Sequence, residues 1–194
     1  MNETTKILYK CIEARYTKVV WTHKIQEKQA DLYTNKSKCV KKHICWFTVL
    51  TTGGALSTIY PFPPLVICNN TMDVATYITA VLALFLAYFN LRYGDGLLET
   101  KASDNRKYAA KVHSLRNKYE SLMYDIMADK LSDEEIINKR GKLENEENEL
   151  YSCVAPYTSS KACKLADKAL KIDRESTTDD DEIKAIVPKE LLVI

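Results

Sequence analysis

The 194-residue chain contains only five glycines and five prolines. Tight turns between strands depend on these residues, so their scarcity argues against a many-stranded sheet and favours helices. The sequence also lacks a nucleophile elbow, a phosphate-binding loop, a dinucleotide fingerprint, a zinc-peptidase motif and a paired-carboxylate arrangement. Gly53 and Gly54 are not a phosphate loop, because no lysine follows them within reach. We therefore predict an all-α protein that is not an enzyme.

Cysteine and histidine lack the spacing of a metal site. The six cysteines, at positions 11, 39, 45, 68, 153 and 163, include no C-x-x-C pair, and the three histidines are scattered. We predict no metal and no other cofactor, and we expect the thiols to be reduced, as is usual in the cytoplasm.

Charge is missing from two neighbouring stretches of the chain. No charged side chain lies between His43 and Asp73, and none lies between Asp73 and Arg92. The helical part of each stretch, residues 44–60 and 74–91, covers roughly 26 Å, close to the ~30 Å hydrocarbon core of a bilayer. Aromatic residues near the ends of both stretches fit an interfacial belt better than the alternative, a hairpin buried in a soluble bundle. We predict a two-span transmembrane helical hairpin continued by a cytoplasmic long-helix bundle.

The distribution of basic residues predicts the orientation of this hairpin. Residues 1–43 contain ten Lys or Arg against four Asp or Glu, whereas residues 61–72 contain no Lys or Arg. By the positive-inside rule, both termini are cytoplasmic. The expected segments are an N-terminal cytoplasmic amphipathic helix (1–43), transmembrane helix 1 (44–60), an extracytoplasmic tip (61–73), transmembrane helix 2 (74–92), a cytoplasmic helical region (93–172), and a flexible acidic linker with an apolar tail (173–194).

Small and hydroxyl-bearing residues occur in both spans. The small residues allow helix backbones to approach closely, so we predict that the hairpin packs through Gly53, Gly54, Ala80, Ala83 and Ala87. Five hydroxyls are candidates to line a narrow, uncharged water path in an oligomer: Thr48, Thr51, Thr52, Ser57 and Thr58. The alternative is that each threonine only bonds a carbonyl of its own helix. No charged residue lies within a span, which argues against a proton relay or an ion-coupled carrier.

Two amphipathic seams lie outside the spans. The first contains Leu8, Ile12, Tyr16, Val19, His23, Gln26, Ala30 and Tyr33, and the second contains Tyr108, Val112, Leu115, Tyr119, Leu122 and Ile126. Their spacing of three and four residues and their similar length predict that the two helices pair as a coiled hairpin. His23 and Gln26 are polar residues at positions of the first seam where apolar residues are expected. They indicate either a hydrated helix interface or a site that senses a ligand.

Further helices are predicted downstream. Ser132 and Glu135 form a capping box that starts a helix with Ile136, Leu143 and Leu150 inward and an acidic outer face from Glu144 to Glu149. A short helix over 159–172 has Cys163, Ala166 and Leu170 inward. The apolar segment 183–194 follows an acidic linker. Three roles are open for segment 183–194: it docks into a groove on a neighbour, it plugs an assembly, or it has no role.

The layout of these helices, with the segment Leu150-Tyr-Ser-Cys-Val-Ala-Pro-Tyr-Thr158 and the short helix through Ala166 and Ala169, resembles the SLATT family over roughly residues 5–172. These are bacterial two-span effectors associated with nucleotide-producing and nucleotide-sensing domains. The resemblance implies a multi-pass protein of the bacterial inner membrane that acts in antiphage defence. A partner enzyme, a nucleotidyltransferase or a reverse transcriptase, would signal infection, often with a cyclic oligonucleotide, and activated subunits would assemble or open a pore.

We expect no added sensor domain, and a nucleotide pocket would then have to form between the chain's own helices or between subunits. The basic candidates for such a pocket are Arg15, Lys18, Arg106, Lys107, Lys111 and Arg116. The expected partners are membrane lipid, further copies of the chain and the signalling molecule or enzyme, with no stable nucleic-acid complex. The alternative function is a non-conducting membrane scaffold whose cytoplasmic hairpin recruits a partner protein.

Overall fold

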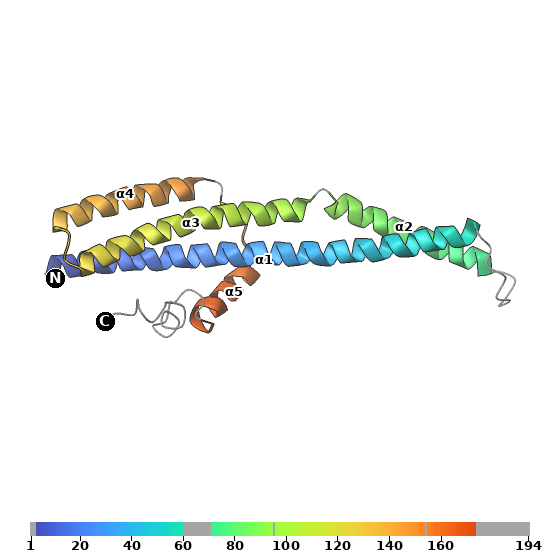
Figure 1. Ribbon diagram of the computed structural model, residues 1–194, viewed down its shortest axis with the longest axis horizontal. Coiled ribbons are helices and arrows are strands. Elements are labelled where there is room, and N and C mark those ends of the chain that lie inside the picture. The colour runs from blue at the N-terminus through green and yellow to red at the C-terminus, as the bar shows by residue number, and fades with distance from the viewer. Residues whose placement is uncertain (1–2, 60–70, 95, 154, 174–194) are drawn as a thin grey trace, which may run out of the picture. The chain divides into compact units, whose positions relative to one another are not determined.

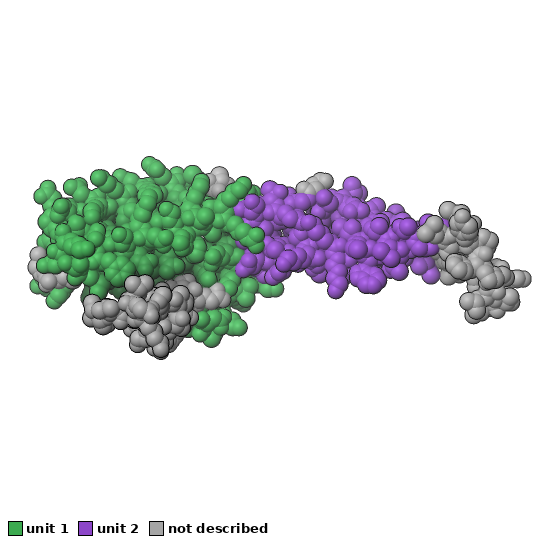
Figure 2. All heavy atoms as spheres, in the orientation of Figure 1, with its two compact units in different colours: residues 1–29, 104–194 green, residues 30–103 purple. Residues whose placement is uncertain are grey.

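The chain is all-helical over the residues that its computed structural model describes, which are 3–59, 71–94, 96–153 and 155–173. Within these described ranges, five helices follow one another: α1 (Glu3–Ile59), α2 (Thr71–Tyr93), α3 (Leu97–Met127), α4 (Asp133–Ser152) and α5 (Ser160–Lys171) (Figure 1). The predicted all-α class is confirmed. The chain divides into two compact units, residues 1–29 with 104–194 (unit 1) and residues 30–103 (unit 2) (Figure 2).

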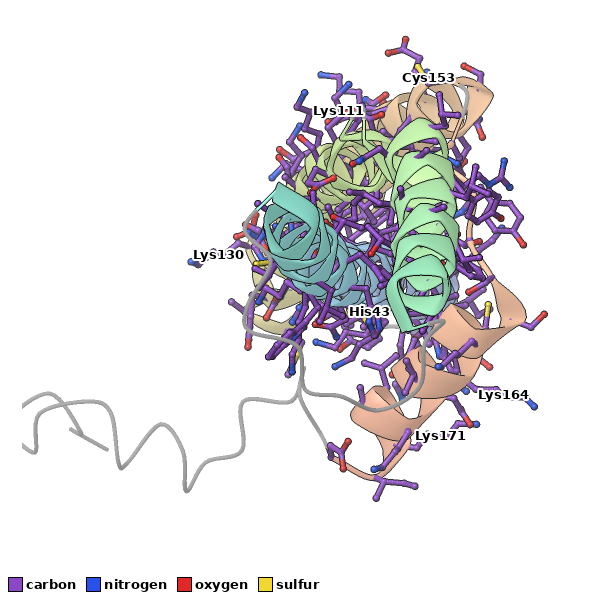
Figure 3. All side chains as sticks on the ribbon, turned by 90° about the vertical axis from the view of Figure 1, so that its right-hand side faces the viewer. His43, Lys111, Lys130, Cys153, Lys164 and Lys171 are labelled. Atoms are coloured by element: carbon purple, nitrogen blue, oxygen red, sulfur yellow. The ribbon has the colours of Figure 1, made fainter. Side chains whose placement is uncertain are left out.

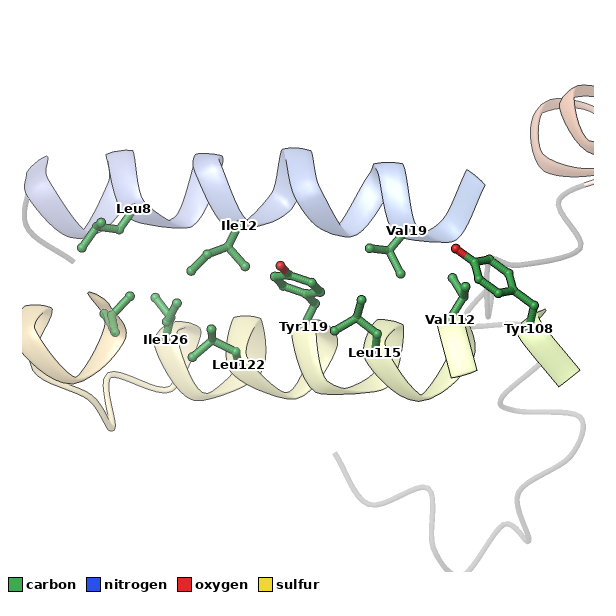
Figure 4. Packing of buried hydrophobic residues seen from close by; sticks show 10 residues of the cluster. Leu8, Ile12, Val19, Tyr108, Val112, Leu115, Tyr119, Leu122 and Ile126 are labelled. Carbon is green, nitrogen blue, oxygen red and sulfur yellow. The ribbon is translucent and has the colours of Figure 1, made fainter. Parts of the chain in front are cut away.

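Unit 1 is organised around the contact between α1 and α3. The buried cluster includes Leu8, Ile12 and Val19 of α1, together with all six seam residues of α3 from Tyr108 to Ile126. Leu8 lies near Ile126 and Val19 near Val112, so the two helices run antiparallel (Figure 4). The predicted pairing of the two seams is therefore confirmed. Apolar side chains spaced three and four residues apart form one stripe on each helix, and burying both stripes removes them from water.

Helix α4 covers the α1–α3 pair and begins at the predicted capping box. The Ser132 side chain accepts a hydrogen bond from the Glu135 backbone, and the Glu135 carboxylate accepts one from the Ser132 backbone, 2.9 Å away. Ile136 is fully buried, and Leu143 and Leu150 pack against the cluster, as expected. One part of the prediction for α4 is wrong, because Glu147 lies in the interior of unit 1 and not on an outer acidic face.

Helix α5 has a different buried face from the predicted one. Its buried residues are Ala162, Ala166 and Ala169, whereas Cys163 and Leu170 are only half-buried. Ala166 is common to the predicted and observed faces. Ala162 lies four residues before it and Ala169 lies three residues after it, so the observed face consists of alanines. A face of alanines lets α5 approach its neighbour closely with little loss of side-chain entropy.

Unit 2 contains residues 30–59 of α1, helix α2 and the first residues of α3. Its buried apolar residues are Ala30, Val40, Leu98 and Ala102. Ser37 and Lys41, one helical turn apart on α1, both donate hydrogen bonds to the carboxylate of Glu99. These two donors lower the pKa of Glu99 to about 2, with the Lys41 bond making the larger contribution.

Aromatic contacts continue this packing along the hairpin of unit 2. The Phe47 ring stacks on Phe85 and Phe89, with centroids 6.3 and 5.8 Å apart. The Lys36 ammonium lies 5.5 Å from the centroid of the Tyr93 ring, a favourable cation–π arrangement. Among the side chains that the structure describes, no helix has an apolar stretch long enough to cross a membrane. The side chains of residues 56–59 and 74–77, which belong to the two predicted spans, lie outside that description, as do those of residues 71–73 in the predicted tip and the whole of residues 60–70.

Two glycines shape the turn between α2 and α3. Gly96 adopts a positive φ of 66°, a conformation that side chains disfavour. Gly94 donates a 2.7 Å hydrogen bond to the Asn90 carbonyl, and a side chain at this position would collide with that carbonyl group. The backbone conformation at Gly96 and the close approach of the Asn90 carbonyl at Gly94 therefore both favour glycine in this turn.

Candidate functional site

A carboxylate is buried at the centre of unit 1. Glu147 of α4 is 2% exposed, and its Oε2 atom accepts a 2.9 Å hydrogen bond from the fully buried Tyr119 hydroxyl. The same oxygen accepts a second bond, of 3.1 Å, from the Arg15 guanidinium of α1. One oxygen atom thus links α4 to both helices of the central pair.

Arg15 also holds a second carboxylate of α4. Its Nε atom lies 3.0 Å from Glu144 Oε1, and Arg140 Nε lies 3.3 Å from that oxygen. Burial lowers the pKa of Arg15, but the hydrogen bond to Glu147 and the charges of Glu144 and Glu147 raise it more, so the net shift is upward. Tyr119 also has a raised pKa, first because of burial and then because of its bond to Glu147 and that residue's charge. These two shifts favour a charged Arg15 guanidinium and a neutral Tyr119 phenol.

The acidic cluster of α4 concealed this buried residue from sequence analysis. Glu147 is four residues after Leu143 and three before Leu150, so it occupies the same stripe as the apolar residues of α4. That spacing is a signal that the stripe contains a carboxylate. Since a buried charge requires a partner, the basic residue opposite it, Arg15, is the second part of the signal.

A second polar layer surrounds His23 of α1. The His23 ring is 8% exposed, and its centroid lies 5.1 Å from that of His113 in α3. Its Nε2 atom is 3.6 Å from Glu27 Oε1, and Glu27 Oε2 accepts a 3.1 Å bond from Lys24. His23 Nδ1 has no hydrogen-bond partner among the described residues. Burial is the main cause of a lowered pKa at His23, opposed by Glu27 and reinforced by His113, Arg116 and Lys24.

Next to this layer, Gln29 attaches α5 to α1. The Gln29 Oε1 atom accepts a 2.8 Å hydrogen bond from the Ser159 backbone and a 2.7 Å bond from its hydroxyl. Ser159 is the N-cap of α5, and its hydroxyl accepts a bond from the Ala162 backbone. At the other end of α5, the Lys171 ammonium lies 5.6 Å from the centroid of the Trp21 ring. Sequence analysis identified neither Gln29 nor Trp21, because neither residue lies on the first seam.

The six basic candidates for a signal pocket have different environments. Arg15 is half-buried in the ion cluster that it forms with Glu144 and Glu147. Arg116 is also half-buried, and its guanidinium lies 6.0 Å from the centroid of the Tyr16 ring. Lys18, Arg106, Lys107 and Lys111 are exposed. Lys111 lines a shallow groove of about 290 Å³ between α3 and α4, together with Glu146, Glu149 and Cys153. Figure 3 shows Lys111 and Cys153 on the same side of the molecule.

The structure describes part of the hydroxyl strip of α1, which is the set of candidate pore-lining residues Thr48, Thr51, Thr52, Ser57 and Thr58. Thr48 donates a 2.8 Å bond to the Ile44 carbonyl, and Thr51 donates a 2.8 Å bond to the Phe47 carbonyl. Thr48 and Thr52 are exposed and Thr51 is half-buried, whereas the side chains of Ser57 and Thr58 lie outside the described residues. Each described hydroxyl bond leaves the oxygen's lone pairs available to water.

The small residues of the hairpin differ in their surroundings. A Cβ atom built at Gly54 would lie 2.5 Å from the Thr79 hydroxyl oxygen of α2, whereas one built at Gly53 meets no described atom within 4 Å. Ala80, Ala83 and Ala87 are exposed in the single chain. The half-buried residues of α2 instead include Thr79, Leu82, Leu86 and Phe89. Of these two glycines, Gly54 therefore approaches α2 closely at Thr79, whereas Gly53 does not meet a described neighbour.

The described part of the chain contains no group of three or more histidine, cysteine or acidic side chains placed to hold a metal ion. Cys11, Cys39, Cys45, Cys153 and Cys163 are free thiols, and Cys68 lies outside the described residues.

Residues 8–182 match the model of a protein family described as SMODS and SLOG-associating 2TM effector domain family 4. No curated protein matches the chain, and no solved structure matches it.

Proposed function

The chain belongs to SMODS and SLOG-associating 2TM effector domain family 4, a family of two-transmembrane effectors of antiphage systems, and from this membership we propose that it is a pore-forming effector. In this proposal, residues 44–60 and 74–92 cross the inner membrane of a bacterium, and both termini are cytoplasmic. Several copies assemble, and the pore opens after an infection signal. The signal is a nucleotide second messenger or contact with the enzyme that makes it.

The observation that supports this function most directly is the exposed apolar surface of unit 2. Large hydrophobic side chains that are half or more exposed follow one another along α1 and α2: Trp46, Val49, Leu50, Ile78, Val81, Leu84, Phe85, Tyr88 and Leu91. Contiguous exposed apolar surface of this kind is typical of a membrane or protein contact. The flanking Lys41, Lys42 and Arg92 are exposed, where they suit lipid headgroups.

The hydroxyl strip supplies the polar surface that a pore requires. Thr48 and Thr52 are exposed beside the apolar residues of the same helix. In an oligomer, the hydroxyl strips of neighbouring copies would face one another. They would hydrate a narrow path that contains no ring of charged side chains. Such a path would discriminate weakly between ions.

Helix α1 supplies a route for gating. It is continuous from Glu3 to Ile59, so it contributes both to the ion cluster of unit 1, through Arg15, and to the apolar surface of unit 2. We propose that a signal acting on the cytoplasmic bundle changes the packing of α1, and that the same helix transmits this change to the membrane hairpin.

A liposome assay tests the conducting function. The purified chain would be inserted into vesicles loaded with potassium and a small dye, and efflux would be followed alone and with a panel of cyclic oligonucleotides. Leakage of either cargo would support the pore, and its dependence on one nucleotide would identify the signal. Vesicles that stay tight under all conditions, including with the partner enzyme added, would contradict it and favour the scaffold.

Thiol accessibility tests the proposed lining. In a background with the native cysteines replaced, Thr48→Cys and Thr52→Cys should react with a water-soluble thiol reagent in the active state, and modification should reduce efflux. Val49→Cys, exposed on the same helix among the apolar residues, is the matched control and should stay unreactive. Equal protection of all three thiols in a conducting preparation would contradict a pore lined by this strip.

A further inference from the structure

A groove between α1 and α3 exposes apolar side chains in unit 1. It measures about 320 Å³ and is lined by Tyr9, Tyr16, Glu120, Met123, Tyr124 and Met127. Tyr124 is 64% exposed and Met127 is 62% exposed, although the adjacent Leu122 and Ile126 are buried in the central cluster. The surface next to the core thus leaves two large apolar side chains in water.

The groove is suited to a peptide with aliphatic side chains. Methionine is flexible and polarisable and adapts to irregular partners. Tyr9 donates a 3.6 Å hydrogen bond to the Met127 sulfur, and Arg116 lies beside the Tyr16 ring, so both tyrosine rings have neighbours that orient them. Glu120 is the one charged lining residue, which favours an apolar segment that also contains a cation.

A segment of the same chain has this chemistry. Residues 183–194, Ile-Lys-Ala-Ile-Val-Pro-Lys-Glu-Leu-Leu-Val-Ile, are mostly aliphatic and include Lys184 and Lys189 against a single acidic residue. The segment lies beyond residues 8–182, which match the family model, and it lies outside the described residues. We propose that residues 183–194 dock intramolecularly in the groove, with their aliphatic side chains against Tyr124 and Met127 and a lysine near Glu120.

The intervening chain is long enough for this contact. The end of α5 lies at Trp21 of α1, where Lys171 contacts the indole ring. Along α1, Trp21 is twelve residues from Tyr9, a distance of about 18 Å. Residues 172–182 can span up to about 36 Å when extended, which allows them to pass around α1 to the groove.

Site-specific photo-crosslinking in the full chain tests the proposal. Leu192 would be replaced by p-benzoylphenylalanine, a probe that reacts readily with methionine side chains. Equal amounts of unlabelled and ¹⁵N-labelled protein would be mixed before irradiation. We expect crosslinks to the tryptic peptide Tyr119–Lys130, which contains both methionines, and we expect each crosslink to join two peptides of the same isotope label. The probe at Thr177 in the acidic linker is the control and should not crosslink to this peptide.

A groove variant makes the test specific. Tyr124→Glu leaves both methionines in place and changes an exposed side chain, so the fold is retained. It should reduce the crosslink yield roughly tenfold, the factor expected when the burial of one large apolar side chain is lost. Tyr157→Glu changes an equally exposed tyrosine outside the groove and should have no effect. Crosslinks between differently labelled chains, crosslinks to lipid or to other helices, or a yield unchanged by Tyr124→Glu would each overturn intramolecular docking.

Discussion

The hydroxyl of Tyr119 donates a 2.9 Å hydrogen bond to the Glu147 carboxylate, and both side chains are almost wholly buried beside the apolar cluster of unit 1. A buried carboxylate is costly to desolvate, and an apolar residue of similar volume would often serve stability as well or better. Glu147 therefore specifies how α4 faces α1 and α3, because only one rotation of α4 brings it to both Tyr119 and Arg15.

Loss of the carboxylate should destabilise unit 1 strongly. Glu147→Ala leaves the Tyr119 hydroxyl without its acceptor and removes a buried partner of Arg15, so we expect a loss of about 3 kcal/mol in the free energy of unfolding. Denaturant unfolding followed by circular dichroism would measure it. Glu146→Ala is the matched control, because Glu146 pairs with Lys118 at the surface and its loss should change stability by less than about 0.5 kcal/mol. Equal effects of the two variants would contradict the assignment of Glu147 to the core.

Stability should fall as the solution is acidified below about pH 6.5. Burial lowers the pKa of His23 in the folded chain below its unfolded value of about 6.5, so the unfolded chain binds the proton first as the pH falls. The contribution of His23 is complete above pH 6.5 and is lost progressively toward the lower, folded-state pKa. Melting temperatures of wild type and His23→Gln at pH 7.5 and 5.5 should show a smaller decrease in the variant. His43→Gln, which changes an exposed histidine of the same helix, should keep the wild-type decrease.

Gln29 should control the attachment of α5. Gln29→Ala removes the acceptor for two hydrogen bonds from Ser159, which we expect to cost about 1–3 kcal/mol in the local opening of α5. Hydrogen exchange of residues 162–171 should accelerate, whereas exchange of residues 119–127 in α3 should not change. Asn35→Ala, an exposed change further along α1, is the control. Unaltered exchange in α5 would show that its alanine face alone holds it in place.

Gly54 should be the glycine on which packing within the hairpin depends. In Gly54→Leu the new side chain collides with Thr79, and overpacking of this kind typically costs about 1–3 kcal/mol. We expect the variant to insert into membranes but to cause no efflux from liposomes. Gly53→Leu meets open space in the single chain, so the thermal stability of the hairpin should be unchanged. Full efflux activity in Gly54→Leu would contradict a packing role.

The helices and the central pairing of unit 1 can be predicted from local spacing in the sequence. Leu8, Ile12 and Val19 pack with the six seam residues of α3 because an apolar stripe with a spacing of three and four residues is removed from water when it faces a second such stripe. The capping box at Ser132 could also be predicted from the sequence, because it depends on two side chains only three residues apart.

The orientation of the weaker stripes, in contrast, depends on contacts between helices that are distant in the sequence. Helix α4 has few apolar residues, so its acidic residues did not reveal which carboxylate faces Tyr119 and Arg15. In α5, small alanines occupy the face where Cys163 and Leu170 were expected, because close approach to α1 favours the smallest side chains there. Gly54 and Gly53 are adjacent and chemically identical, and only the position of Thr79 on α2 distinguishes them. Local spacing specifies which residues share a face, whereas the neighbour that a face meets depends on side chains distant in the sequence.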